Sequence, residues 1–600
     1  MPRTWRFLAH DPSRVRQLSS DLRVSPLVAQ VLIARGLGEE ADEFLNARLT
    51  GLHDPELLPG VADAADRIVS AIRSQRRITI YGDYDVDGVT STALLWHCIK
   101  LAGGRVDFYI PSRLEEGYGL NCDALRQLHQ EDPQRLLISV DCGIGSVAEA
   151  ALAREIGLEL IVTDHHQLGP ALPDACCLVH PRLPGTSYPF GDLCGVGVAL
   201  KLAWGVCQRL GDGKKASPQM RTFLMGAVGL AAIGTIADVV PLRGENRLLV
   251  KYGLKSLIEQ ATPGLKALLS VAQLGDQKTI DSDQIAFAVA PRINAAGRLG
   301  QARLAVELLT TENVDRATAL ASYLDELNKN RRTVEQRIFK EARELMASRP
   351  DWHDAPAVIL HAVDWHPGVI GIVASRVAEH FARPAILIAG NAQTSIGQGS
   401  GRSHGGFDLH AALSACGTHL VSYGGHQAAA GLKIATDRID AFRHDFCRYV
   451  AENHEPVAGA TDLRIDAEVR LCDVTSRAVK ELDRLGPFGH HNPRPVFAAS
   501  RVELAEPPRK MGEGERHLSL RVRHHNTTLR AVAFSRGEWA ESIAGLGRPF
   551  SISFAPCINR FRGNESVELQ LIDWQPDAAA PPEPTQPGPQ QSRPPGIQPA

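Results

Sequence analysis

Short, continuously apolar runs alternate with stretches of helical spacing in the first half of the chain. The apolar runs cover residues 78–81, 105–110, 136–140 and 158–163, and the helical stretches between them cover 91–100, 122–129 and 146–155. Fully apolar strands that alternate with helices are typical of a doubly wound, mostly parallel sheet covered on both faces. The pattern predicts an α/β domain over residues 71–250, after a helical N-terminal segment at 1–70.

The hydrophobic pattern changes again after residue 250. Charged positions with leucines at helical intervals predict a helical connector at 251–350, and a second alternation of strands and helices predicts a smaller α/β domain at 351–456. Apolar and polar residues then alternate singly at 457–575, which predicts an antiparallel barrel of about five strands, an OB-fold. The proline-rich residues 576–600 are predicted to be a disordered tail.

The composition narrows the possible function classes. The chain has 600 residues, of which 44% are hydrophobic and 22% charged, and its formal net charge of −3 excludes a surface that is basic throughout. The 11 cysteines include no CxxC pair, and no apolar run reaches the ~18 residues of a membrane span. The N-terminus lacks the apolar core of a signal peptide. We therefore predict a cytoplasmic protein with reduced thiols and no membrane association.

Acidic residues and histidines follow the ends of the apolar runs. They are Asp83, Asp85 and Asp87 after the first run, Asp141 after the third, Asp164, His165 and His166 after the fourth, and Asp238 after a long apolar helical run. Each acid taken alone is compatible with a helix cap, and adjacent histidines with a surface turn. The carboxyl ends of parallel strands meet at one sheet edge, so we expect these groups to converge there. Several acids brought together repel one another unless a cation lies between them.

The mixture of donors indicates the chemistry. Carboxylates with imidazoles suit Mn2+ or Mg2+, and a cluster of this size can hold two ions. Two neighbouring ions activate a water and stabilise both oxygens in phosphoryl displacement. The sequence contains no Walker loop, dinucleotide-binding glycine fingerprint or nucleophile elbow. The residues therefore predict hydrolysis of a phosphate ester without a covalent intermediate.

Four segments resemble, in order and spacing, the motifs of the DHH phosphoesterase superfamily, and more closely those of its RecJ family of single-strand-specific DNA exonucleases. The segments are GDYDVDG from Gly82, VDCGIG from Val140, DHH from Asp164 and IADVVPL from Ile236. The resemblance implies that the metal ligands are Asp85, Asp87, Asp141, His165 and Asp238. It also implies catalytic roles for Asp83 and Asp164, as ligands or orienting groups, and for His166, facing the scissile phosphate. Smaller superfamily members have a histidine where this chain has Tyr81, and Asp83 is the candidate replacement.

Two segments between the predicted sheet and the next domain offer contacts for a strand. In SRLEEGYGLN, Arg113 provides a guanidinium for phosphate and Tyr118 an aromatic face for a base, although a solvated loop can have the same composition. The RecJ pattern places these residues along the strand's path, and places Arg292 and Arg298 of PRINAAGRLG near the incoming 5′ end.

The second α/β region contains three glycine-rich segments, at 366–376, 399–406 and 424–431. We interpret them as loops that let the backbone approach a phosphate, although each alone is more typical of a turn. The last, GGHQAAAG, resembles the hallmark of the DHHA1 domain, which follows the DHH domain in this family. The resemblance makes Arg402, Ser403 and His426 substrate contacts.

The predicted barrel has arginines at exposed strand positions, namely Arg521, Arg523, Arg530 and Arg560. They are consistent with a single-strand-binding face, and equally with a β-domain whose charged face is only solvated. GPFGHHNPRPVF resembles the segment that opens the RecJ OB domain, and departs from it at His491 and Arg494.

The resemblance implies a metal-dependent exonuclease that degrades single-stranded DNA from 5′ to 3′ to mononucleotides in DNA repair and recombination. It further implies a monomer whose partners are a single-strand DNA-binding protein and a helicase. The polarity and the choice of DNA rest on the resemblance alone. The alternatives are an oligoribonucleotide or cyclic-dinucleotide phosphodiesterase, a non-catalytic single-strand-binding scaffold, and a pyrophosphatase.

Overall fold

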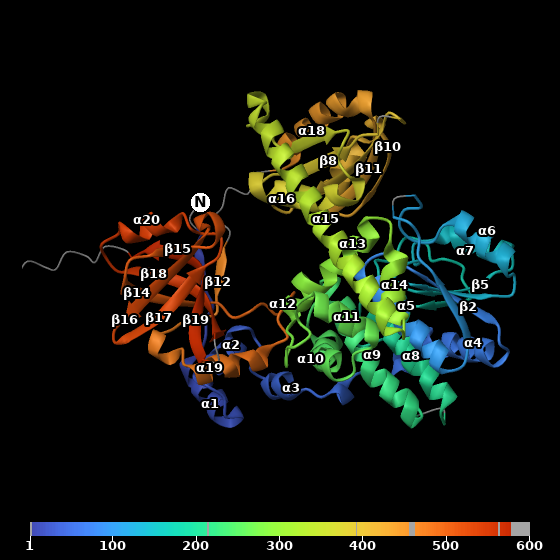
Figure 1. The fold of residues 1–600 in the computed structure, drawn as a ribbon, viewed down its shortest axis with the longest axis horizontal. Coiled ribbons are helices and arrows are strands. Elements are labelled where there is room, and N and C mark those ends of the chain that lie inside the picture. The colour runs from blue at the N-terminus through green and yellow to red at the C-terminus, as the bar shows by residue number, and fades with distance from the viewer. Residues whose placement is uncertain are drawn as a thin grey trace, which may run out of the picture. The chain divides into compact units, whose positions relative to one another are not determined.

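The computed structural model describes residues 3–577, apart from 114, 213–214, 392, 455–461 and 562–563 (Figure 1). The chain divides into two compact units. One contains Asn46–Ala458 with Gly486–Pro493, and the other contains Met1–Leu45, Gly459–Leu485 and Arg494–Ala600. The tail predicted to be disordered falls largely on residues 578–600, which lie outside the described residues.

The larger unit contains the predicted parallel sheet. Its strand order is β3-β2-β4-β5-β6, and every neighbouring pair is parallel. The strands are β2 (Arg77–Gly82), β3 (Arg105–Tyr109), β4 (Leu136–Val140), β5 (Glu159–Thr163) and β6 (Cys177–Val179). The predicted doubly wound sheet is therefore confirmed, and the ends of β2, β4 and β5 lie at one edge.

Helices cover both faces of this sheet because alternate strand residues point to opposite sides. Ile80 and Ile138 pack in the core formed with α4 (Val61–Arg73), α5 (Val86–Leu101), α8 (Gly195–Leu210) and α9 (Pro218–Ala237). Leu137 and Val162 pack on the other face with α6 (Cys122–Glu131) and α7 (Val147–Glu155). The labels α6 and α7 lie on one side of β2 and β5 in Figure 1, and α4 and α8 on the other.

By length and composition alone, α9 is long and apolar enough to cross a membrane. Most of its apolar stretch is buried, and it packs against α5, α8 and α10 (Gly244–Glu259). A core helix at the centre of a globular unit has the same composition, and this is the position of α9.

The predicted helical connector follows α10. It comprises α11 (Pro263–Val271), α12 (Ser282–Gln284), the π-helix η3 (Ile285–Val289), α13 (Ala290–Arg298), α14 (Ala302–Thr310) and α15 (Val314–Ala347). The 34-residue helix α15 connects the first α/β region to the second and packs against α11, α13 and α16 (Pro367–Phe381).

The second α/β region has a mixed sheet of order β10-β11-β9-β8-β7. Its strands are β7 (Val358–Ala362), β8 (Ala385–Ala389), β9 (Ile396–Arg402), β10 (Leu420–Gly425) and β11 (Ala429–Ala435). Our interpretation of its glycine-rich segments as loops is wrong for most of their length. The first begins helix α16, the second continues strand β9, and the third spans the end of β10 and the start of β11. Glycine is needed there for packing: a Cβ on Gly399 would lie 2.7 Å from a Leu432 side-chain carbon.

The smaller unit contains the predicted barrel. The strands β14 (Phe497–Leu504), β18 (Phe550–Phe561), β19 (Asn564–Pro576), β17 (Thr527–Ala533) and β16 (His517–His524) are paired in this order, and pairing of β14 with β16 closes the ring. This confirms the OB-fold. The N-terminal residues pack with it: β1 (Trp5–Phe7) pairs with β12 (Leu463–Ile465), and Arg35 forms an ion pair with the buried Asp466 at 2.8 Å.

The four arginines at exposed barrel positions are paired with glutamates. Each lies within ion-pair distance of one carboxylate: Arg521 of Glu506, Arg523 of Glu503, Arg530 of Glu568 and Arg560 of Glu565. The strand positions were predicted correctly, but their charge is largely balanced on the same surface.

Candidate metal centre and nucleic-acid interface

The first acidic motif lies where β2 ends and α5 begins. In an extended segment Asp85 and Asp87, two residues apart, would point the same way. Instead α5 begins at Val86, and Asp87 belongs to its first turn. Asp85 caps the helix, since one of its oxygens accepts hydrogen bonds from the amides of Asp87 at 2.8 Å and Gly88 at 3.2 Å. The cap and the metal-site hypothesis are therefore compatible for Asp85, because a carboxylate has a second oxygen free.

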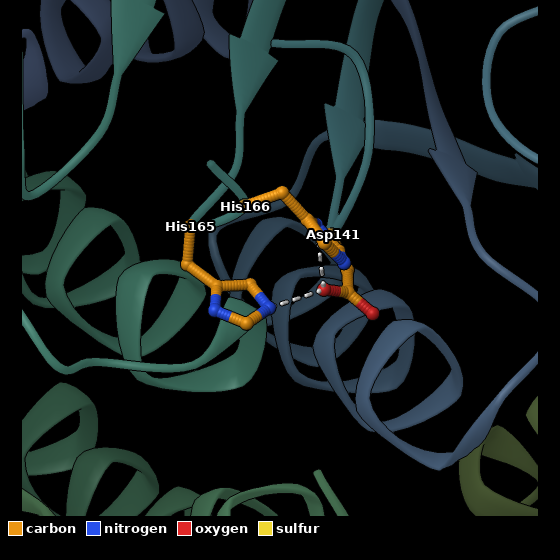
Figure 2. A group of neighbouring side chains, drawn as sticks. All are labelled: Asp141, His165 and His166. Carbon is orange, nitrogen blue, oxygen red and sulfur yellow. Dashed lines mark ion pairs between the residues drawn. The ribbon is translucent and has the colours of Figure 1, made fainter. Parts of the chain in front are cut away.

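The remaining ligand candidates converge on this point from three other elements. Nε2 of His165 lies 3.2 Å from Asp141 Oδ1, 3.6 Å from Asp238 Oδ2 and 3.9 Å from Asp87 Oδ2. Asp141 follows β4, His165 follows β5, and Asp238 ends α9. Figure 2 shows the imidazoles of His165 and His166 beside the same carboxylate of Asp141.

The candidate ligand atoms form two neighbouring sets. One set is Asp83, Asp85 and Asp141, and the other is Asp87, His165 and Asp238; within each set the ligand atoms lie within 4.8 Å of one another. Asp141 also groups with His165 and His166, so its carboxylate lies between the two sets. This is the arrangement that two cations bridged by one carboxylate require.

Buried polar atoms at this point fit a cation. Within the described part of the chain, Asp83 Oδ1, Asp141 Oδ1 and His165 Nε2 are buried without a hydrogen-bond partner. Burial and then the neighbouring carboxylates raise the pKa of Asp87 to about 7 and that of Asp238 to about 8. The same causes raise the pKa of Asp141 well above its usual value. So many crowded acids remain ionised only if positive charge lies between them, which a divalent ion supplies.

Asp141 also has an unusual backbone. Its φ of +59° is in the left-handed region, which a non-glycine residue adopts at a cost of roughly 1–3 kcal/mol. Strain of this kind at the end of a core strand is typical of a side chain whose direction is set by function.

Asp164 holds His166 in position. Its Oδ1 lies 2.7 Å from Nδ1 of His166 and accepts the amide hydrogen of His165, while Oδ2 accepts that of Ile144. Burial alone raises the pKa of Asp164, but the hydrogen bond and charge of His166 lower it to about 2. The same pair outweighs the burial of His166 and raises its pKa to about 9. The imidazole is therefore positively charged near neutral pH and partly exposed beside Asp141.

Tyr81 and Tyr118 have different roles. Tyr81 is fully buried, and its hydroxyl donates to the carbonyl of Gly119 at 3.1 Å, whereas Asp83 belongs to a ligand set. Tyr118 is 54% exposed, and its hydroxyl lies 3.2 Å from Nδ1 of His166. The structure thus brings Tyr118 to the site and leaves Tyr81 in the core.

Our reading of the motifs missed the amides that hold Asp87. The backbone N–H groups of Gly195 and Val196, at the start of α8, donate to its two oxygens at 2.6 and 2.8 Å. A Cβ on Gly234 of α9 would lie 2.7 Å from Asp87 Oδ1, so only glycine fits there. The sequence does contain a signal for these contacts, because Gly195 and Gly234 are glycines within stretches of helical pattern.

Arginines surround the acidic cluster. Arg113 lies over the ring of Tyr84, a residue that the motifs did not single out, with its guanidinium carbon 5.0 Å from the ring centre. Burial and then the charges of Arg113, Arg331 and Arg402 lower the pKa of Arg298 to about 10. Among the described residues no carboxylate forms an ion pair with Arg113, Arg298 or Arg402. Cations without an acidic partner beside a cluster of candidate metal ligands can attract a polyanion.

For three of the predicted substrate-contact residues, the structure gives weaker support for contact with a strand. Arg292 is bound to Asp325 at 2.8 Å, with its guanidinium also donating to the carbonyls of Ala288 and Val271. The hydroxyl of Ser403 donates to the carbonyl of Phe407 at 2.6 Å. His426 is exposed next to the end of β10. The structure therefore gives Arg292 an acidic partner and Ser403 a carbonyl partner. Arg402 donates to the hydroxyl of Ser400 at 3.1 Å and the carbonyl of Gly401 at 2.7 Å, but among the described residues it forms no ion pair with a carboxylate.

A parallel sheet that gathers acids and imidazoles at one edge, together with a second α/β region and an OB barrel, defines a phosphoesterase of the DHH type. Family models match three parts of the chain: the DHH family, N-terminal domain, at residues 77–233; the DHHA1 domain at 355–452; and the RecJ OB domain at 465–573.

Relatives extend the match to almost the whole chain. The single-stranded-DNA-specific exonuclease RecJ of Bacillus subtilis is 38% identical over 95% of this chain and 70% of its own length. RecJ of Escherichia coli is 34% identical over 91% of this chain and 95% of its own. The crystal structure of RecJ from Thermus thermophilus in complex with Mn2+ has a TM-score of 0.80 at 32% identity, and covers 96% of this chain and 80% of that one. The chain belongs to the RecJ family of single-stranded-DNA-specific exonucleases.

Proposed function

We propose that this protein hydrolyses single-stranded DNA from its 5′ end to mononucleotides, using two Mn2+ or Mg2+ ions. The main support for the proposal is the position of the Asp141 carboxylate between two sets of candidate metal ligands. Arginines without acidic partners lie beside these sets. Crystal structures of RecJ from Thermus thermophilus contain Mn2+ or Mg2+, and the donors here suit the same ions. The 5′ polarity is inferred from the family.

The ligand assignment follows the two sets. Asp83 and Asp85 would hold one ion, Asp87, His165 and Asp238 the other, and Asp141 both. Ions held there would supply Lewis-acid activation of a water and neutralise charge in the transition state.

The protein's own groups bind and orient the strand. His166, kept charged by Asp164, donates a hydrogen bond to an oxygen of the scissile phosphate. Arg298 and Arg402 bind the phosphates on either side of the scissile bond, and Tyr118 presents an aromatic face to a base. Ser403 and His426 would contact the strand through the DHHA1 region, whereas Arg292 positions α13 through Asp325.

We further propose the cellular setting that the family suggests. The enzyme would act in the cytoplasm as a monomer, in DNA repair and recombination. A helicase would produce its single strands, and a single-strand DNA-binding protein would deliver them.

The experiment separates binding from chemistry. Asp87→Asn and His165→Ala should bind a 20-nucleotide single strand as the wild type does and lose cleavage, while a Mn2+ titration falls from two ions per chain to one. Each variant removes a ligand that contacts no phosphate in this scheme. Turnover close to wild type in either variant would refute the ligand assignment.

A further inference from the structure

We propose that one face of η3 and α13 is a track for the single strand, and that Phe287 is a stacking platform for an unpaired base at its far end. This inference rests on the proposed function and adds a substrate contact to it. The track is continuous with the metal centre through Arg298.

The track is defined by helical spacing. Phe287, Pro291, Asn294 and Arg298 are separated by four, three and four residues, which places them on one face of a helix. All four are at least partly accessible, whereas Val289, Ile293 and Gly297, which lie outside this face, are buried.

The C-terminal end of α13 is fixed to the site. A Cβ on Gly297 would lie 2.2 Å from the carbonyl oxygen of Tyr84, which is adjacent to the ligand Asp85, and a Cβ on Gly368 would lie 2.1 Å from that of Arg298. Arg298 is thus held between the metal-binding motif and the start of α16, close to Arg113 and Arg402. A strand whose phosphate lies at Arg298 can continue along the accessible face of the same helix.

Phe287 is presented in an unusual way. Its side chain is 74% exposed, more than any other large apolar side chain in the described protein, although Ile285 and Val289 on either side are fully buried. These residues form a π-helix, a rare element that often occurs at functional sites. An exposed aromatic ring offers a stacking surface to any of the four bases.

Asn294 lies between the ring and the guanidinium. Its amide has no hydrogen-bond partner among the residues that the structure describes, so its donors and acceptor are available to a base edge or a sugar. The face therefore presents an aromatic ring, an amide and a cation in succession, which suits a single strand better than an apolar protein partner.

The length of the track sets its reach in nucleotides. Eleven residues separate Phe287 from Arg298, or about 16 Å at ~1.5 Å per residue. A stacked strand advances ~3.4 Å per nucleotide, so the ring would meet a base no more than about five nucleotides from the phosphate at Arg298.

The test compares Phe287→Ala and Phe287→Trp with the wild type. The Michaelis constant for a 20-nucleotide strand should rise roughly tenfold in Phe287→Ala, stay near wild type in Phe287→Trp, and be unchanged for a dinucleotide in both. Phe7→Ala is the matched control, because Phe7 is also an exposed phenylalanine, at 48%, on β1 of the other unit. Similar Michaelis constants for Phe287→Ala and the wild type on the long strand would overturn the inference.

A second measurement uses the wild type without cleavage. Strands carrying one 2-aminopurine at each of positions 2 to 6 from the 5′ end are bound in the presence of chelator. Fluorescence should be quenched at one or two adjacent positions, and this quenching should disappear in Phe287→Ala. A profile without such a position in the wild type would also refute the platform. If the wild type did not degrade the 20-nucleotide strand at all, the proposed function itself would fail.

Discussion

Replacing Gly195 with alanine should lower kcat/KM about 100-fold while the protein remains folded. Gly195 is the first residue of α8, and a Cβ there would lie 2.6 Å from Oδ1 of Asp141 and 2.7 Å from its Cβ. Restoring an ordinary contact of about 3.4 Å requires a displacement of about 0.8 Å, and misplacement by ~1 Å costs about 10²-fold in rate. The loss corresponds to roughly 2.7 kcal/mol of transition-state stabilisation.

The fold should tolerate this change. Alanine is favoured over glycine in a helix by roughly 0.5–1 kcal/mol, which partly offsets an overpacking cost of about 1–3 kcal/mol. The assay is steady-state hydrolysis of a single strand with a thermal melt and a Mn2+ titration on the same samples. Gly145→Ala is the control, because a Cβ on Gly145, in the same VDCGIG motif as Asp141, meets no atom within 4 Å. If Gly195→Ala kept kcat/KM within twofold of wild type, close packing of Gly195 against Asp141 would not determine the position of that carboxylate.

Two further predictions concern charge. Arg402→Ala should weaken binding of a single strand and reduce the slope of log affinity against log salt concentration by about one. Arg376→Ala should leave the slope unchanged, because the Arg376 guanidinium is already paired with Glu335 at 2.9 Å. Equal slopes in the two variants would show that Arg402 contacts no phosphate. In metal-free protein, stability should fall as pH rises from about 6.5 to 8. The raised pKa values of Asp87, about 7, and Asp238, about 8, mean that the folded state binds protons which the unfolded state has already lost. The raised pKa of His166, about 9, acts in the same direction, because its stabilising charge is lost as pH rises. The melting temperature measured with chelator should decrease over this pH range, and saturating Mn2+ should abolish the decrease. An increase in stability over the range would refute the raised pKa values of these acids.

The sequence predicted the sheet and its acids for a simple reason. Buried parallel strands such as β4 are apolar at every position, so the polar residue that ends each run is visible without a structure. Their convergence then follows from topology, because parallel strands share one carboxyl edge. The OB barrel was predictable from single alternation of apolar and polar residues.

Other features depend on contacts that no local pattern records. The α8 amides that hold Asp87 and the pairing of Arg292 with Asp325 both join segments that are far apart in the sequence. The glycines of β9 looked like loop residues because the side chains they pack against, such as Leu432, lie far along the chain. The sequence could not decide between a strand-binding and a solvated barrel face, because each arginine and its glutamate are on different strands or loops.

The most direct test of the central claim is digestion of one long single strand labelled at either end, beside its blunt duplex, with Mn2+, Mg2+ or chelator. We expect rapid release of the 5′ label as a mononucleotide, only with a divalent ion and only from the single strand. We expect no release by Asp141→Ala, which should still bind the strand. Release of the 3′ label first would contradict the polarity. Cleavage by Asp141→Ala, or in chelator, would contradict the two-ion centre itself.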